Sequence, residues 1–157
     1  MSDRSVLELL ATHPFTADLS EEQQAQLAAC ARIAHFEPDE YLLREGQPAT
    51  AFYLIVSGLV SIEVFVPGHG PRPLQTVEGG SAVGWSWMLA PSRWEFDARA
   101  LERTTAVVFD AERLRALFLE DCCLGLRLVQ RLLFIITERL RAARLQLLDL
   151  YGPPRER

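Results

Sequence analysis

All three tryptophans of the chain lie within ten residues of one another, and an arginine and a phenylalanine accompany them. The members of this cluster are Trp85, Trp87, Arg93, Trp94 and Phe96. Indole rings usually pack in a core, but they also line pockets for planar or apolar ligands. An arginine beside them could pair with an anion. The cluster is therefore the first candidate site, and packed core is the alternative interpretation.

Charged residues alternate with apolar ones at the end of this cluster. The charged members are Glu95, Asp97 and Arg99. In a strand, such alternation places the charges on one face and the apolar side chains on the other. Neighbouring carboxylates could serve in acid–base chemistry, but no second catalytic group is evident nearby. We therefore interpret the charges as a solvated face with Asp97 near Arg99, and we expect no catalytic residue.

The histidines show no metal-binding pattern. His13, His35 and His69 are widely separated in the sequence, whereas a metal site needs several ligands in a defined arrangement. No Ser–His–Asp, Cys–His or phosphate-loop motif is recognisable. We expect no metal and no other cofactor, and we expect that the protein is not an enzyme.

The elements that position the cluster change from helices to strands near Phe36. Helices are predicted for residues 5–11, 20–32, 86–89, 110–118 and 121–151. Strands are predicted for residues 40–44, 52–56, 59–66, 74–77, 97–101 and 104–109. Ser20 and Gln23 form a capping box at the second helix, and Asp110 caps a later one. Many short strands separated by glycine turns indicate a sandwich or barrel with flanking helices.

The last helix spans roughly 45 Å at 1.5 Å per residue and carries a nearly continuous apolar stripe. The stripe that we expect to pair with a second copy consists of Val129, Leu132, Ile136, Leu140, Ala143, Leu147 and Leu150. A helix this apolar needs two covering surfaces, its own barrel and something else. A second copy of the same helix is the economical candidate, so we expect a homodimer.

Length and composition favour a single domain over residues 1–157, with a mass of 17.7 kDa. The net charge of −5 argues against a nucleic-acid partner. The apolar run 132–136 is far shorter than the ~20 residues of a membrane span, and the N-terminus has no secretory signal. We expect Cys122 and Cys123 to pack as small apolar residues, and the three cysteines to be reduced in a cytoplasmic protein.

Three motifs coincide with the order of these elements. They are LLREGQPA at 42–49, FYLIVSGLV at 52–60 and GSAVG at 80–84. Together they resemble the cyclic nucleotide-binding domain family, over a range from about Leu9 to Tyr151. The resemblance implies a mainly β fold, a β-roll or jelly roll of about eight strands with flanking helices. It divides the chain into N-terminal helices (1–35), the β-roll (36–109, with the phosphate-binding cassette at 80–100) and C-terminal helices (110–151).

The best-known members of this family are the catabolite activator protein and its bacterial relatives. In these regulators the long helix forms the dimer, and a helix-turn-helix DNA-binding domain follows it. The present chain ends where that domain would begin. The resemblance therefore implies a stand-alone sensor domain that binds a small molecule and does not bind nucleic acid by itself.

The cassette departs from the family pattern at its charged positions. The family has a glutamate that holds the ribose 2′-hydroxyl and, after a short loop, an arginine that pairs with the cyclic phosphate. Alignment without gaps through Gly84 and Ala100 places Trp85 at the glutamate and Trp94 at the arginine. An indole donates one hydrogen bond and cannot neutralise a phosphate. Arg93, aided by backbone amides that follow Ser86, could substitute after a one-residue slip.

Our leading hypothesis is a non-catalytic regulatory module with a degenerate cassette that does not bind cyclic AMP or cyclic GMP in the usual way. It either senses another ligand or has lost binding. The alternatives are a dimerisation or protein-interaction domain whose pocket is plugged by tryptophans, with an unidentified protein partner, and a genuine cyclic nucleotide binder that uses Arg93. The candidate ligand-binding residues are Gly84, Trp85, Ser86, Trp87, Arg93, Trp94 and Phe96.

Overall fold

The computed structural model describes residues 3–152 of the chain. It begins with two helices, α1 (Asp3–Thr12) and α2 (Glu21–Ala28). The predicted capping box starts α2: the Ser20 hydroxyl accepts a hydrogen bond from the Gln23 amide, and the Gln23 side chain accepts one from the Ser20 amide, both at 3.1 Å. The helix start is therefore confirmed, but the helix ends four residues earlier than the predicted end at residue 32.

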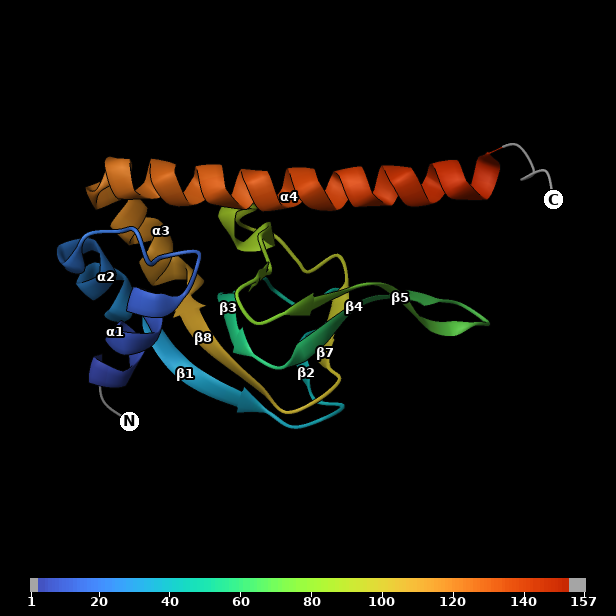
Figure 1. Cartoon of the computed structure of the whole chain (residues 1–157), viewed down its shortest axis with the longest axis horizontal. Helices are drawn as coiled ribbons and strands as arrows, with labels where there is room; N and C mark the ends of the chain where they lie inside the picture. Colours follow the sequence, from blue (N-terminus) through green and yellow to red (C-terminus); the bar gives the residue numbers. More distant parts are fainter. Residues whose placement is uncertain (1–2, 153–157) are drawn as a thin grey trace.

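Eight strands in the described residues form two four-stranded sheets. They are β1 (Ala31–Phe36), β2 (Tyr41–Leu43), β3 (Ala51–Ser57), β4 (Leu59–Val66), β5 (Gly70–Glu78), β6 (Ala82–Val83), β7 (Asp97–Ala100) and β8 (Thr104–Asp110). The strand orders are β1-β8-β3-β6 and β2-β7-β4-β5, with antiparallel pairing throughout. This arrangement is the β-roll with flanking helices that the sequence predicts (Figure 1).

The β-roll begins at residue 31 rather than at 36. Strand β1 pairs with β8 over its whole length, from Ala31 opposite Phe109 to Phe36 opposite Thr104. This long-range pairing overrides the helical periodicity that extends our predicted helix to residue 32. Strand β5 is also longer than predicted, because it continues through Pro71. A proline is tolerated there because β5 is an edge strand, and on its open side no neighbouring strand needs a backbone N–H.

Two helices follow the roll, α3 (Ala111–Glu120) and α4 (Cys122–Tyr151). Each begins at an aspartate cap: Asp110 accepts from the Arg113 amide at 2.9 Å, and Asp121 accepts from the Leu124 amide at 3.0 Å. Figure 1 shows α4 running along one side of the roll, from α3 to the side where the β4–β5 hairpin extends. Among residues 3–152, no helix has the length and apolar character needed to cross a membrane.

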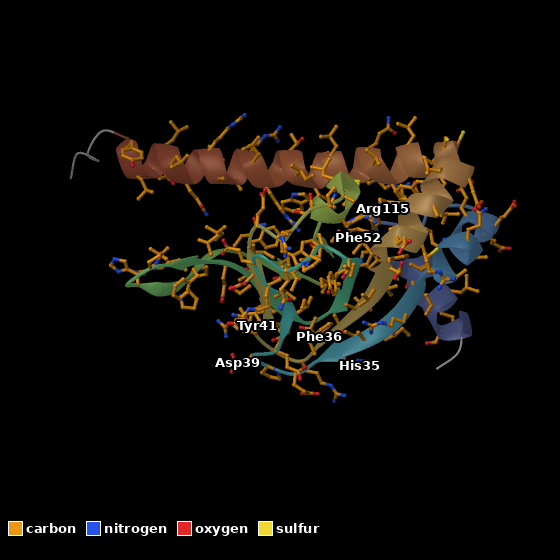
Figure 2. All side chains as sticks on the ribbon, turned by 180° about the vertical axis from the view of Figure 1, so that it is seen from behind. His35, Phe36, Asp39, Tyr41, Phe52 and Arg115 are labelled. Atoms are coloured by element: carbon orange, nitrogen blue, oxygen red, sulfur yellow. The ribbon has the colours of Figure 1, made fainter. Side chains whose placement is uncertain are left out.

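Phe52 lies in the core of the roll and joins it to the surrounding helices (Figure 2). Its ring centroid is 5.6 Å from those of Phe15 and Trp87, and 5.8 Å from that of Phe109. Tilted aromatic pairs at such distances add to the apolar burial. Trp87 belongs to the short 3-10 helix η1 (Ser86–Leu89), which the sequence predicts at the same residues. The core is therefore continuous from the N-terminal turn to the cassette.

His13 is a buried polar residue that links the end of α1 to β3. Its Nε2 lies 2.8 Å from the Ile55 carbonyl, and its Nδ1 accepts a hydrogen bond from the Phe15 amide at 3.1 Å. These two contacts hold the neutral tautomer that carries its proton on Nε2. Burial lowers the pKa of His13 below its ordinary value of 6.5.

The neutral state of His13 predicts a loss of stability in acid. Below pH 6.5 the unfolded chain binds a proton on this imidazole that the folded chain resists, so the free energy of unfolding decreases as the pH falls. The slope from this group is at most about 1.4 kcal/mol per pH unit. We expect the stability difference between wild type and His13→Gln to be constant above pH 7 and to shrink below pH 6.5. Urea unfolding at several pH values measures it, and a pH-independent difference would contradict the prediction.

Candidate functional site

Trp94 is part of the packed core of the cassette. Its side chain is 4% exposed, and its ring packs against Gly84, where an added Cβ would be 2.8 Å from Cη2 of the indole. Gly84 also has a φ of +84°, a conformation that favours glycine. The Trp94 amide donates to the Gln47 carbonyl at 2.9 Å, and its carbonyl accepts from the Gly46 amide at 2.8 Å. Ring and backbone are therefore both fixed.

Trp87 belongs to a different cluster from Trp94. It is 1% exposed and packs between Phe52 and Phe118, with a ring distance of 5.8 Å to the latter. Arg115 on α3, which Figure 2 labels, donates a hydrogen bond to the Trp87 carbonyl. The indole Nε1 has no hydrogen-bond partner within the described chain. Trp87 thus anchors η1 to the core rather than lining a pocket with the other tryptophans.

Trp85 is the half-buried indole of the three. Its ring is 5.5 Å from that of Phe96, and the Arg139 guanidinium lies 5.2 Å from its centroid. Arg139 reaches this position from α4 and donates a hydrogen bond from Nη2 to the Ala82 carbonyl. Its Nη1 is buried without a partner among residues 3–152. Burial lowers the pKa of Arg139 to about 10.

Arg139 is the residue of this site that sequence reasoning missed. A signal was present, because it lies four residues after Ile135 and seven after Leu132, on the side of α4 that faces the roll. A cation at such a position needs an aromatic or polar neighbour, and Trp85 supplies it.

The other predicted ligand-binding residues divide between core and surface. Ser86 and Phe96 are 7% exposed. Arg93 is exposed, and its Nη1 donates to the Gly46 carbonyl at 2.7 Å. The structure therefore brings Gly84 against Trp94 and Trp85 against Phe96, but it places Arg93 on the outer edge of the cassette.

Of the three alternating charges, Glu95 is exposed as expected, but Asp97 and Arg99 on β7 do not form a solvated face. Asp97 is 7% exposed and accepts a hydrogen bond from the Glu45 amide at 2.8 Å. Arg99 binds Glu63 on β4 at 2.7 Å and Asp39 at 2.5 Å rather than Asp97. The hydrogen bond with Glu63 raises the pKa of Arg99 above its usual range. The physical reason is that neighbouring segments supply polar partners on this face, the Glu63 carboxylate from β4 for Arg99 and the Glu45 amide after β2 for Asp97.

The exposed apolar stripe of α4 differs from the predicted one at a single position, where Leu133 takes the place of Leu132. Leu132 is 1% exposed and belongs to the core, whereas Leu133 is 61% exposed. Including Leu132 in the dimer stripe was therefore wrong. The α4 seam, defined as the accessible apolar positions with alternating spacings of three and four, comprises Leu126, Val129, Leu133, Ile136, Leu140, Ala143, Leu147 and Leu150.

The cysteines and histidines form no metal site among the described residues. Cys30 is buried, but Cys122 and Cys123 are exposed, so the expectation that these two pack as apolar residues was wrong. Both lie in the first turn of α4, which follows directly after α3. His35 contacts the Thr105 hydroxyl at 3.1 Å.

The family model of the cyclic nucleotide-binding domain matches residues 33–121, more than half of the chain. The chain therefore belongs to the cyclic nucleotide-binding domain family. It is similar to a cyclic nucleotide-binding domain from Methylobacillus flagellatus, with a TM-score of 0.78, 23% identity and coverage of 98% of this chain and 86% of that one. For the sensor domain of the transcriptional regulator DNR from Pseudomonas aeruginosa, the TM-score is 0.70, the identity 23% and the coverage 88% and 93%.

Two further relatives are protein-kinase components. The regulatory subunit of a cAMP-independent protein kinase A from Trypanosoma cruzi, bound to guanosine, has a TM-score of 0.68 and 22% identity, with 83% of this chain and 44% of that chain covered. The cGMP-dependent protein kinase 2 of Homo sapiens is 24% identical over 68 residues, which are 43% of this chain and 9% of the kinase. The matched part is thus about a tenth of the kinase. The fold and family are those of regulatory ligand-binding domains.

Proposed function

We propose that this protein is a non-catalytic regulatory module whose cassette does not hold cyclic AMP or cyclic GMP in the usual way. The observation that carries the proposal is the packing of Trp94 against Gly84, at the position where the family pattern has an arginine. Arg93, the candidate substitute, donates to a backbone carbonyl on the exposed edge. Loss of each charge-assisted contact to the nucleotide would cost about 1.5–3 kcal/mol.

The cassette is better suited to a ligand that lacks a cyclic phosphate than to a cyclic nucleotide. The half-buried Trp85 and the Arg139 guanidinium offer an aromatic face and unused hydrogen-bonding capacity. The Trypanosoma cruzi relative, which is bound to guanosine, is a precedent for a nucleoside on this fold. Because Arg139 contacts both Trp85 and the Ala82 carbonyl, a ligand that displaced it would shift the cassette relative to α4.

The α4 seam supports a homodimer as the working form of the module. Six of its residues are between 39% and 76% exposed, namely Leu126, Val129, Leu133, Leu140, Leu147 and Leu150. A single chain rarely leaves an apolar surface of this extent uncovered. We place the module in the cytoplasm, where free cysteines such as the three of this chain persist. A protein partner is part of the proposal, and direct binding to nucleic acid is not.

Tryptophan fluorescence tests the cassette directly, because all three indoles lie in it. We expect no saturable change with cyclic AMP or cyclic GMP up to millimolar concentrations, since neither charged contact of the family is present. Excitation at the red edge of the indole band limits absorption by the nucleotides, and calorimetry serves as the second readout. Guanosine is titrated in parallel to test for a nucleoside ligand.

Variants of the two candidate arginines show which residue is responsible for any response to a ligand. A micromolar response to cyclic AMP that Arg93→Ala removes would overturn the proposal in favour of the genuine nucleotide binder. A response to guanosine that Arg139→Gln removes would support sensing through Trp85. If all three compounds leave fluorescence and heat unchanged, the closed pocket and the interaction domain are the better description.

A further inference from the structure

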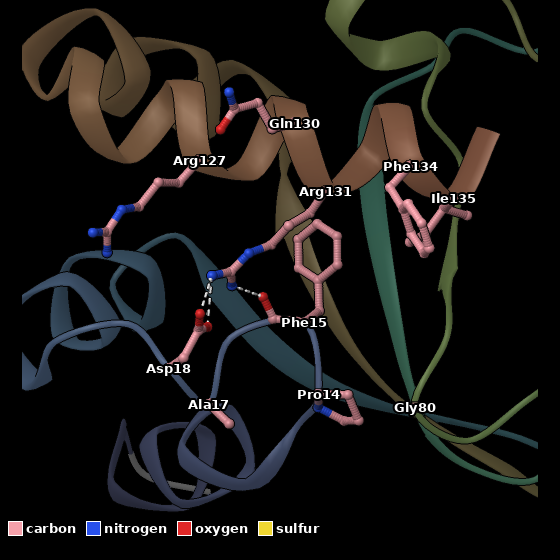
Figure 3. A pocket seen from close by; sticks show the side chains of 10 residues that line it. All are labelled: Pro14, Phe15, Ala17, Asp18, Gly80, Arg127, Gln130, Arg131, Phe134 and Ile135. Carbon is pink, nitrogen blue, oxygen red and sulfur yellow. Dashed lines mark hydrogen bonds and ion pairs between the residues drawn. The ribbon is translucent and has the colours of Figure 1, made fainter. Parts of the chain in front are cut away.

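A cleft of about 780 Å³ lies outside the cassette, between the turn that follows α1 and the N-terminal half of α4. Figure 3 shows Pro14 and Phe15 on the turn and Arg127, Arg131 and Phe134 on the helix. Gly80 also lines the cleft, and a Cβ on it would be 3.4 Å from the Pro14 ring. The volume is within the range of roughly 300–1,000 Å³ typical of small-molecule sites.

One end of the cleft carries more positive than negative charge. Arg131 donates to the Phe15 carbonyl and pairs with Asp18 at 2.6 Å (Figure 3). Arg127 is one turn earlier on the same side of α4, and it has no ion pair or hydrogen bond within residues 3–152. The pKa of Asp18 is lowered, first by its hydrogen bond with Arg131 and further by the charge of Arg127. Two cations thus face one carboxylate, and Arg127 is available to another anion.

The other end of the cleft is apolar. Phe134 is 66% exposed, Ile135 is half-buried beside it, and Pro14 lies opposite. The cleft therefore offers the unpaired guanidinium of Arg127 at one end and the exposed ring of Phe134 at the other, so a ligand that spans it meets both a positive charge and an apolar surface (Figure 3). Arginine pairs well with carboxylate and related acidic groups.

The cleft is separate from the α4 seam. At 100° per residue, Arg127 and Leu133 project roughly 120° apart around the helix axis, as do Phe134 and Leu140. A second copy that covers the seam therefore leaves this flank of the helix accessible. The cleft and the dimer surface can be occupied at the same time.

We propose that this cleft binds an amphipathic organic anion, with its acidic group on Arg127 and its apolar or aromatic body on Phe134 and Pro14. The ligand would bridge the N-terminal turn, the start of the cassette at Gly80 and α4. It would therefore fix the position of the helix relative to the roll without entering the cassette. The site is independent of whether the cassette binds a nucleoside.

The probe for this proposal is 8-anilino-1-naphthalenesulfonate, which joins an aromatic body to an anionic group and fluoresces in apolar surroundings. We expect saturable binding at one site per chain, weakened at least tenfold by Arg127→Gln. Arg144→Gln is the matched control, because Arg144 is exposed on the same helix and outside the cleft. Phe134→Ser is expected to weaken binding as well, and its exposed position keeps the fold intact.

The neutral analogue N-phenyl-1-naphthylamine separates the charge from the ring system. We expect it to bind more weakly than the sulfonate and to be insensitive to Arg127→Gln. The proposal is overturned if Arg127→Gln retains the wild-type affinity for the sulfonate, if Arg144→Gln weakens it equally, or if the neutral analogue binds equally well. Thermal unfolding of each variant shows whether the fold is preserved, and Phe134→Ser gives an independent test should Arg127→Gln alter it.

Discussion

Replacement of Arg99 by methionine is expected to lower the free energy of unfolding by about 3–5 kcal/mol, because it leaves a buried carboxylate without its partner. The carboxylate is that of Glu63, which is 2% exposed. Its two oxygens accept from Nε and Nη2 of Arg99 at 2.7 to 3.4 Å. The second partner of Arg99, Asp39, has a side chain that is 80% exposed, so its contribution is small. Urea unfolding at a fixed protein concentration measures the effect.

Two controls separate this effect from the loss of any arginine. Arg103 pairs with Glu37 at 3.5 Å, and their side chains are 72% and 61% exposed. Arg103→Met should therefore cost at most about 1 kcal/mol. The double variant Glu63→Gln with Arg99→Met should lose less stability than Arg99→Met alone, because no charge is left buried. Equal losses for Arg99→Met and Arg103→Met would contradict the prediction.

The partner of Arg99 illustrates which part of the site the sequence cannot predict. Alternation along β7 correctly places Asp97 and Arg99 on one face, because a strand has a period of two residues. Whether that face meets solvent depends on the neighbouring strand. The register of β4 on β7 places Ser61 opposite Arg99 and Glu63 opposite Asp97, and the diagonal pair of Arg99 with Glu63 follows from it. Such a register between distant segments is not visible in the spacing of either one.

Local signals predicted most of the fold for identifiable reasons. The predicted caps Ser20 and Asp110 bond backbone amides three residues away through their side chains, so the local sequence alone specifies them. Strand β4 has the predicted bounds because it is rich in β-branched and aromatic residues and lies between two turn signals. The two-residue strand β6 was not predicted, since it is too short to have a periodicity and exists through its pairing with Tyr53 and Leu54.

The cassette was predicted in composition but not in arrangement. The ungapped alignment places two indoles, Trp85 and Trp94, at positions where the family pattern has charged residues, and this placement stays a prediction. It could not show that Trp94 packs against Gly84 while Trp85 faces Arg139, because the second contact depends on where α4 crosses the roll. Likewise, the stripe on α4 was predicted from spacing, but Leu132 and Leu133 both fit that spacing. Only the contact with the roll distinguishes the buried leucine from the exposed one.

A glutamate at Leu133 or Leu140 is expected to raise the dissociation constant of the homodimer at least about a hundredfold, because each dimer would bury two unpaired carboxylates in the seam. These leucines are 61% and 49% exposed in the single chain, so the fold itself should tolerate the change. Leu145→Glu is the matched control: Leu145 is 57% exposed on the same helix but lies off the seam. Light scattering after size-exclusion chromatography measures the mass. An unchanged dimer in both seam variants would contradict the prediction.

The seam also determines which cysteine a parallel dimer can cross-link. Cys122 lies four residues before Leu126 and continues the seam, whereas Cys123 projects to another side of the helix; both are exposed. In a parallel pair with twofold symmetry, Cys122 faces the same residue of the second copy. Mild oxidation should therefore yield a covalent dimer in the wild type and in Cys123→Ser, and none in Cys122→Ser. A solution dimer that never cross-links would mean that the seams pair in an antiparallel manner, because each Cys122 would then lie near the far end of the partner helix. Cross-linking through Cys123 instead would mean that a face of α4 other than the seam forms the interface.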